Sequence, residues 1–64
     1  MIKPVSRDEF AAAILQHKEW KDHLTEGFRI SVIQYLDSDD QVKAQAIYQG
    51  GSPGPVSISY YLTN

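Results

Sequence analysis

The sequence predicts an α+β domain in which a single N-terminal helix packs on a three-stranded antiparallel β-meander, in the order αβββ. Apolar residues recur with the 3.6-residue period of a helix over residues 7–25, and the period changes to two from Phe28 onward. Two segments of turn-forming residues divide the second half into three runs. With 64 residues in all, the chain is expected to form one small αβββ domain over residues 1–64.

The helix has clear start and stop signals. Ser6 suits the N-cap position, and Glu9 three residues later completes a capping box. Gly27 can adopt the positive φ angle that turns a chain away from a helix end, so the helix is expected to cover residues 7–25. One helical face then carries the residues expected to lie on the sheet: Phe10, Ala13, Ile14, His17, Trp20, Lys21 and Leu24.

Three strands are predicted over residues 28–36, 42–48 and 56–63, with a tight turn at 37–40 and a longer loop at 50–55. Pairing apolar faces places Leu36 opposite Val42 and Tyr48 opposite Val56. Small Ala44 and Ala46 in the middle strand are suited to a close helix crossing. The face toward the helix is expected to consist of Phe28, Ile30, Val32, Gln34 and Leu36, then Val42, Ala44, Ala46 and Tyr48, then Val56, Ile58, Tyr60 and Leu62.

The same register predicts an apolar outer face that the single helix cannot cover. A chain of this length without cysteine has no disulfide to supplement its core, so either unusually complete packing or a partner surface must supply the remaining stability. An apolar patch surrounded by polar residues is typical of an interface, although ordinary exposed sheet surface is the alternative. The predicted binding residues are Ile33, Tyr35, Lys43, Gln45, Ile47 and Tyr61.

The last predicted strand offers a second route to association. Residues 56–63 carry no charge and no proline, so the strand lacks the usual features that discourage strand addition. If it were the free edge of the meander, a second copy or a partner protein could extend the sheet there. The expected partners are therefore a second copy of the chain, as a homodimer, or a larger protein that it would serve as adaptor or inhibitor.

Charge and motifs argue against other classes of function. The net charge of −2 argues against nucleic acid as a partner. The alternative to a protein-interaction module is nevertheless a single-stranded nucleic-acid module, with a stacking platform made of Tyr35, Tyr61, Arg29 and Lys43. His17 and His23 are about 240° apart on a helix, so no metal site is predicted. Residues 37–48 fail the calcium-loop pattern, and residues 50–55 lack the Lys-Ser/Thr pair of a phosphate loop.

The sequence therefore predicts a non-enzymatic protein-interaction module without catalytic residues, metal or cofactor. No apolar N-terminal segment indicates export, and no run approaches the 18 apolar residues of a membrane helix. The absence of cysteine is compatible with a reducing compartment, so a cytoplasmic location without membrane association is expected.

Overall fold

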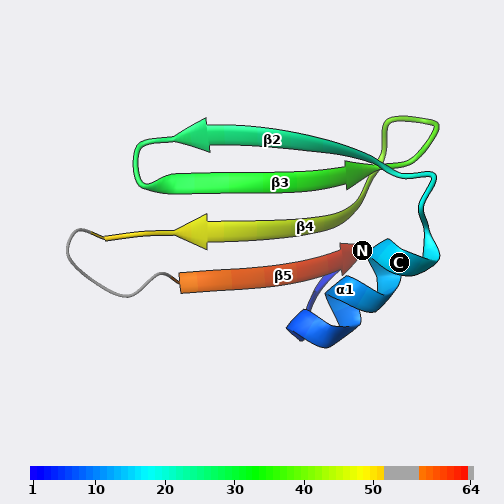
Figure 1. The fold of residues 1–64 in the computed structure, drawn as a ribbon, viewed down its shortest axis with the longest axis horizontal. Coiled ribbons are helices and arrows are strands. Elements are labelled where there is room, and N and C mark those ends of the chain that lie inside the picture. The colour runs from blue at the N-terminus through cyan, green and yellow to red at the C-terminus, as the bar shows by residue number, and fades with distance from the viewer. Residues whose placement is uncertain (52–56, 64) are drawn as a thin grey trace.

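The computed structural model describes residues 1–51 and 57–63. Within them the order of elements is βαββββ, and the strands form one antiparallel sheet in the spatial order β1-β5-β4-β3-β2 (Figure 1). The α+β class, the N-terminal helix and the antiparallel sheet are confirmed, but the sheet has five strands rather than three. The elements are β1 (Ile2–Val5), α1 (Arg7–Gln16), β2 (Lys21–Gly27), β3 (Ile30–Leu36), β4 (Val42–Gln49) and β5 (Ser57–Thr63).

The helix begins where its capping residues predict and ends nine residues earlier than expected. The Glu9 backbone N–H donates to the Ser6 hydroxyl oxygen at 3.1 Å, which satisfies one of the free donors of the first turn. At the other end His17 leaves the helical region with φ −117° and ψ 67°, and the Trp20 N–H donates to the His17 carbonyl at 3.1 Å. The His17 and Trp20 rings stack with centroids 4.4 Å apart, which fixes this turn.

After the turn at residues 17–20, the rest of the predicted helix lies in the edge strand β2, which continues to Gly27. Without β2, one edge of β3 would expose a row of unpaired backbone N–H and C=O groups. Residues 21–27 satisfy these groups because they pair with β3 as a strand rather than continue the helix. Arg29, at φ 59°, provides the left-handed residue of the tight β2–β3 turn. The described glycines have no positive φ, so the role predicted for Gly27 as a helix stop is wrong.

The last strand is not a free edge. β5 lies between β1 and β4, with Ile2 opposite Thr63 and Val5 opposite Tyr60. The prediction that this strand is available for a partner strand is therefore wrong, because the unpredicted β1 occupies its outer side. The actual edges are β1, which is short and contains Pro4, and β2, which carries three charged residues. Both features discourage addition of another strand.

A β-bulge changes which side chains of β3 face the helix. Leu36 lies opposite Val42 as predicted, but Tyr35 lies opposite Ala44, so Lys43 is an extra residue in β4. The faces of β3 are consequently inverted: Ile33 and Tyr35 lie on the helix side, and Val32 and Gln34 lie on the opposite, open face. β4 from Ala44 onward and the described part of β5 keep their predicted faces, whereas Val42, opposite Leu36, lies on the open face. Tyr48 pairs with Ile58, and its predicted partner Val56 is outside the described residues.

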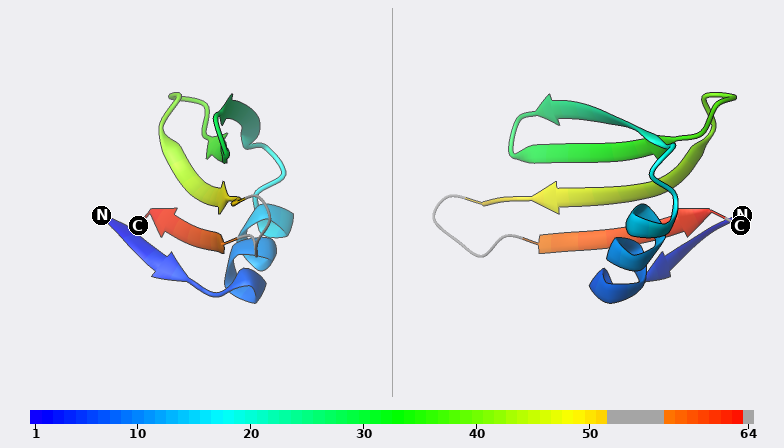
Figure 2. Two further views of the ribbon diagram at one scale, coloured as in Figure 1. Left: turned by 90° about the vertical axis from the view of Figure 1, so that its left-hand side faces the viewer. Right: turned by 45° about the vertical axis from the view of Figure 1, so that its right-hand side comes forward.

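The core is small and lies at one end of the sheet. Among the described residues the buried apolar side chains are Phe10, at 8% exposure, Ala44, at 1%, and Ala46, at 0%. The two alanines lie under the helix crossing, as predicted. Several half-buried residues complete this cluster: Val5, Ile14, Trp20, Ile33, Tyr35, Tyr60 and Leu62. Figure 2 shows α1 across one face of the sheet, near the end where β1 begins, with the other face uncovered.

Candidate functional site: a groove beside the helix

The helix is too small to cover the face on which it lies. Five strands about 4.8 Å apart make a sheet about 19 Å wide, and seven residues at about 3.3 Å give strands about 23 Å long. The ten residues of α1 span about 15 Å, with a width of about 10 Å. The helix therefore covers about a third of this face, and the part toward the β2–β3 turn is bare (Figure 1).

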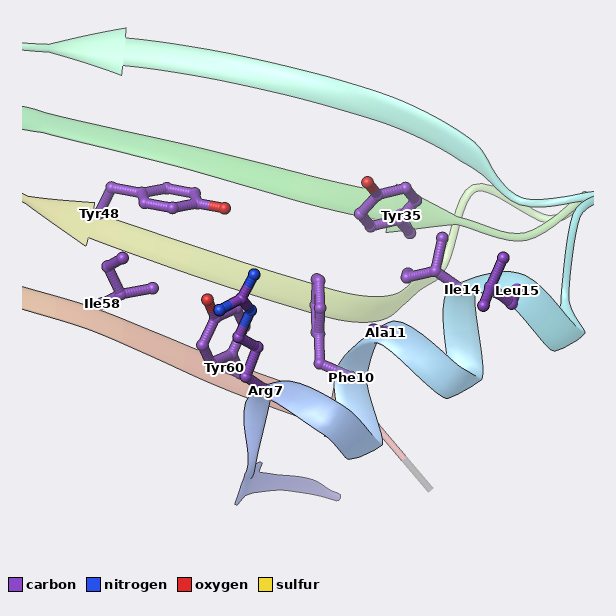
Figure 3. Close-up of a pocket in the computed structure, with 9 residues that line it drawn as sticks. All are labelled: Arg7, Phe10, Ala11, Ile14, Leu15, Tyr35, Tyr48, Ile58 and Tyr60. Atoms are coloured by element: carbon purple, nitrogen blue, oxygen red, sulfur yellow. The ribbon is translucent and has the colours of Figure 1, made fainter.

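A groove of about 690 Å³ lies between α1 and this bare part of the sheet. Figure 3 shows Tyr48, Ile58 and Tyr60 along the sheet side of the groove, Arg7 at the start of the helix, and Tyr35 with Ile14 and Leu15 toward the helix end. Side chains of α1, β3, β4 and β5 thus converge on one apolar and aromatic hollow. Its lining residues are Arg7, Phe10, Ala11, Ile14, Leu15, Tyr35, Tyr48, Ile58 and Tyr60.

The core holds the floor of the groove in place, while the outer lining remains accessible. The Phe10 ring contacts Tyr35 edge-on at 5.9 Å and lies tilted 5.0 Å from Tyr60, both favourable aromatic geometries. Tyr48 is 36% exposed, Ile58 45% and Leu15 70%. The groove therefore combines rings fixed by the core with apolar side chains that nothing in the described chain covers.

Charges of opposite sign lie at the two sides of this face. Arg7 points into the groove from the start of α1 (Figure 3). On the edge strand β2, Asp22 lies opposite Tyr35 and Glu26 opposite Ser31, which places both acids on the helix side of the sheet. Burial raises the pKa of the Tyr35 hydroxyl above its usual value, and the negative charge of Asp22 acts in the same direction. The face is thus polarised, with a cation near the helix start and acids at the far edge.

The predicted binding residues do not form one surface. Ile33 and Tyr35 lie on the helix side, whereas Gln45, Ile47 and Tyr61 lie on the open face. The bulge residue Lys43 pairs with Asp37, its Nζ 3.7 Å from the carboxylate oxygen. Of the six predicted residues, Tyr35 alone lines the groove.

The alternative stacking platform is also divided. Tyr35 and Tyr61 lie on opposite faces of the sheet. At the β2–β3 turn the Arg29 guanidinium lies over the Phe28 ring, 4.9 Å from its centroid. The four residues predicted for nucleic acid therefore cannot stack against one strand together.

Side chains at the centre of the open face contact one another across the strands. The Gln34 amide donates to the Gln45 side-chain carbonyl at 2.8 Å, so the polar pair at its centre is hydrogen-bonded. Val32 lies directly opposite Ile47, and both are half-buried. Both faces nevertheless expose large apolar side chains: Leu24, at 57%, adds to the groove residues on the helix side, and Ile2, at 52%, and Ile30, at 36%, lie on the open face.

Sequence reasoning missed most of the groove. Arg7, Leu15, Tyr48 and Ile58 were not among the predicted site residues, because a helix over residues 7–25 would have covered the whole sheet. Leu15 carried the available signal, since it points away from the apolar stripe of the helix.

No group of three His, Asp or Glu side chains in the described part of the chain is arranged to hold a metal ion. His17, in the turn after α1, has its Nδ1 3.2 Å from the Glu19 carboxylate, whereas His23 lies in β2. A hydrogen bond from its own backbone N–H lowers the pKa of Glu19, and the His17 side chain contributes in the same direction. These contacts stabilise the turn after α1.

No family model, curated protein or solved structure shows significant similarity to the chain. Within the described residues no helix has the length and apolar character needed to cross a membrane. The geometry of the groove is therefore the basis on which a function can be assigned.

Proposed function

We propose that the chain is a small protein-interaction module that binds another protein surface through the groove between α1 and the sheet. The observation that carries the proposal is the groove itself, an apolar hollow whose outer residues Leu15, Tyr48 and Ile58 are 36–70% exposed. Contiguous exposed apolar surface of this kind is typical of an interaction site.

The composition of the groove supports a protein as the ligand. Tyrosine, phenylalanine and arginine are enriched at the centres of protein interfaces, and the groove contains three tyrosines, Phe10 and Arg7. Since Phe10 already fixes Tyr35 and Tyr60, little ordering of these rings is needed on binding. Nucleic acid fits less well, because Asp22 and Glu26 on the same face would repel phosphates.

A photo-crosslinking experiment tests the proposal. A photoreactive phenylalanine analogue is placed at Tyr48, in the groove, or at Gln49, the next residue of β4 and on the other face. The purified chain and the chain in an extract of its source cells are then irradiated. We expect protein adducts from position 48 and few from position 49, because the two positions share a strand and differ in the face that they present.

A second variant separates specific from random adducts. Ile58→Asp places a charge in the groove beside Tyr48 and should abolish the adduct at position 48 while the chain remains folded by circular dichroism. Equal crosslinking at positions 48 and 49, or adducts to nucleic acid alone, would contradict the proposal.

A further inference from the structure

We infer that the occupant of the groove is the α1 helix of a second copy of the chain, in a two-fold dimer with two parallel helices between two sheets. This inference rests on the proposed function and names its partner. The bare part of the helix-side face has the width of one more helix, and the flank of α1 toward the groove is itself incompletely covered, with Leu15 at 70% exposure. Each copy therefore has both a helix that can enter the partner's groove and a groove that can accept the partner's helix.

Symmetry determines how the helices can be arranged. For each helix to lie on the bare part of the other sheet, the sheets must be on opposite sides of the helix layer. The two-fold axis then runs between the helices and parallel to them. Rotation about such an axis keeps the direction of a helix, so the two helices are parallel and residues at the same level meet.

This arrangement brings opposite charges together at the helix starts. Arg7 faces the groove, and Asp8 follows it by 100° around α1, on the side away from its own sheet. The two Arg7 side chains then face each other at the same level, and the second copy's Asp8 approaches each of them as a counter-charge, a pair that the two-fold repeats. Ala11, one turn later on the groove flank, is small enough for the helices to approach closely.

The dimer also covers the apolar residues that the single chain exposes. Leu15 and Ala12 of one copy lie toward the bare sheet of the other, where the exposed side chains of Leu24, Tyr48 and Ile58 are located. Each copy thus supplies apolar helix residues to cover apolar sheet residues of its partner.

The surface of the whole chain is larger than a compact monomer of its mass requires. A compact 7.2 kDa protein exposes about 4,100 Å², whereas this chain exposes 4731 Å². Its radius of gyration is 12.2 Å, against about 10.7 Å for 64 residues. The chain thus exposes about 600 Å² more than a compact protein of its mass.

Complementary charge variants test this inference. Arg7→Glu places two Glu–Asp repulsions in the homodimer, and Asp8→Arg places two Arg–Arg repulsions. In a heterodimer of the two variants every cross-copy pair is again of opposite sign. Sedimentation equilibrium should show a reversible dimer for the unmodified chain, at least tenfold weaker association for each variant alone, and restored association in an equal mixture. Circular dichroism checks that both variants fold.

Asp39→Arg is the matched control, since it makes the same change of charge at the β3–β4 turn, outside the groove residues. It should associate like the unmodified chain. An unmodified chain that stays monomeric at every concentration, or a mixture that associates no better than its components, would overturn the dimer. Adducts from position 48 to a different protein in that case would leave the proposed function standing, whereas no adduct at all would contradict both.

Discussion

Phe10 is the one large side chain that the described part of the fold buries, so its truncation should cost more than any comparable change. It is 8% exposed, and about nine-tenths of its surface is therefore hidden. Nine-tenths of the roughly 200 Å² of a phenylalanine side chain is about 180 Å², which at about 25 cal/mol/Å² corresponds to about 4.5 kcal/mol. Phe10→Ala is expected to lower the free energy of unfolding by about 3–5 kcal/mol, because the cavity also removes the ring contacts with Tyr35 and Tyr60.

That loss is large relative to what a chain of this size can spare. At about 0.05–0.15 kcal/mol per residue, 64 residues give a total stability of about 3–10 kcal/mol. Phe10→Ala should therefore unfold a substantial fraction of the chain without denaturant. Urea unfolding followed by far-ultraviolet circular dichroism measures the change, with all variants at one protein concentration because association would add to stability.

Phe28 provides the matched control for this substitution. It is 85% exposed at the β2–β3 turn, and its main contact is the Arg29 guanidinium at 4.9 Å. Phe28→Ala should cost less than about 1 kcal/mol. If both alanine variants lose the same stability, Phe10 is not the centre of the core and the packing of α1 on β4 and β5 described above is incorrect.

Four further changes have defined outcomes. Ser6→Ala removes the acceptor of the Glu9 N–H and should cost about 1 kcal/mol in urea unfolding, with Ser6→Asp close to the unmodified chain. Ala46→Leu should cost about 1–3 kcal/mol because a 0% exposed site under the helix cannot accept the added volume; a neutral result would place the helix elsewhere. The Gln41 and Asp39 N–H groups lower the pKa of Asp37 below its ordinary 3.8. The contribution of Asp37 to the free energy of unfolding is therefore present above that pH and is lost as pH falls through the lowered pKa, and Asp37→Asn should reduce the dependence of stability on pH in acid. Tyr35 has a raised pKa, so its contribution to the free energy of unfolding is complete below the ordinary pKa of 10.0 and is lost as pH rises through the higher pKa of the folded chain. Tyr35→Phe should therefore lose less stability at high pH than the unmodified chain.

Local signals predicted local features well. The capping residues Ser6 and Glu9 determine the start of α1, because the hydrogen bond that they form depends on residues three positions apart. The pair Ala44 and Ala46 indicated the helix crossing, since small residues at the centre of a strand allow a helix to pack close to the sheet. In both cases the signal that predicted the feature lies within a few residues of sequence, although the helix crossing itself joins distant segments.

The end of the helix depends on distant residues and could not be predicted in the same way. Residues 21–27 fit a helical stripe about as well as a strand, and the choice is made by the free edge of β3, which gains a full set of backbone partners. Likewise β1 forms because β5 has a free side near the chain start. The stabilisation that a segment gains by pairing with a distant strand cannot be read from the hydrophobic pattern of that segment alone.

The bulge had the largest effect on the predicted site. One extra residue, Lys43, moves Ile33 and Tyr35 to the helix side and leaves Ile47 on the open face. The predicted pairing of Leu36 with Val42 was correct, yet the faces of β3 beyond it were inverted, because side chains alternate with a period of two. The predicted contact surface was thereby divided between two faces, and the groove was overlooked.

The proposed association uses the helix side of the sheet rather than its open face, and two tyrosines distinguish the faces directly. Tyr48 lines the groove, and Tyr61 lies on the open face beside Gln45. Aromatic ring signals in solution nuclear magnetic resonance, recorded across a concentration series, should shift and broaden for Tyr48 while those of Tyr61 stay constant. Signals of Tyr61 that move with concentration while those of Tyr48 remain fixed would contradict the claim.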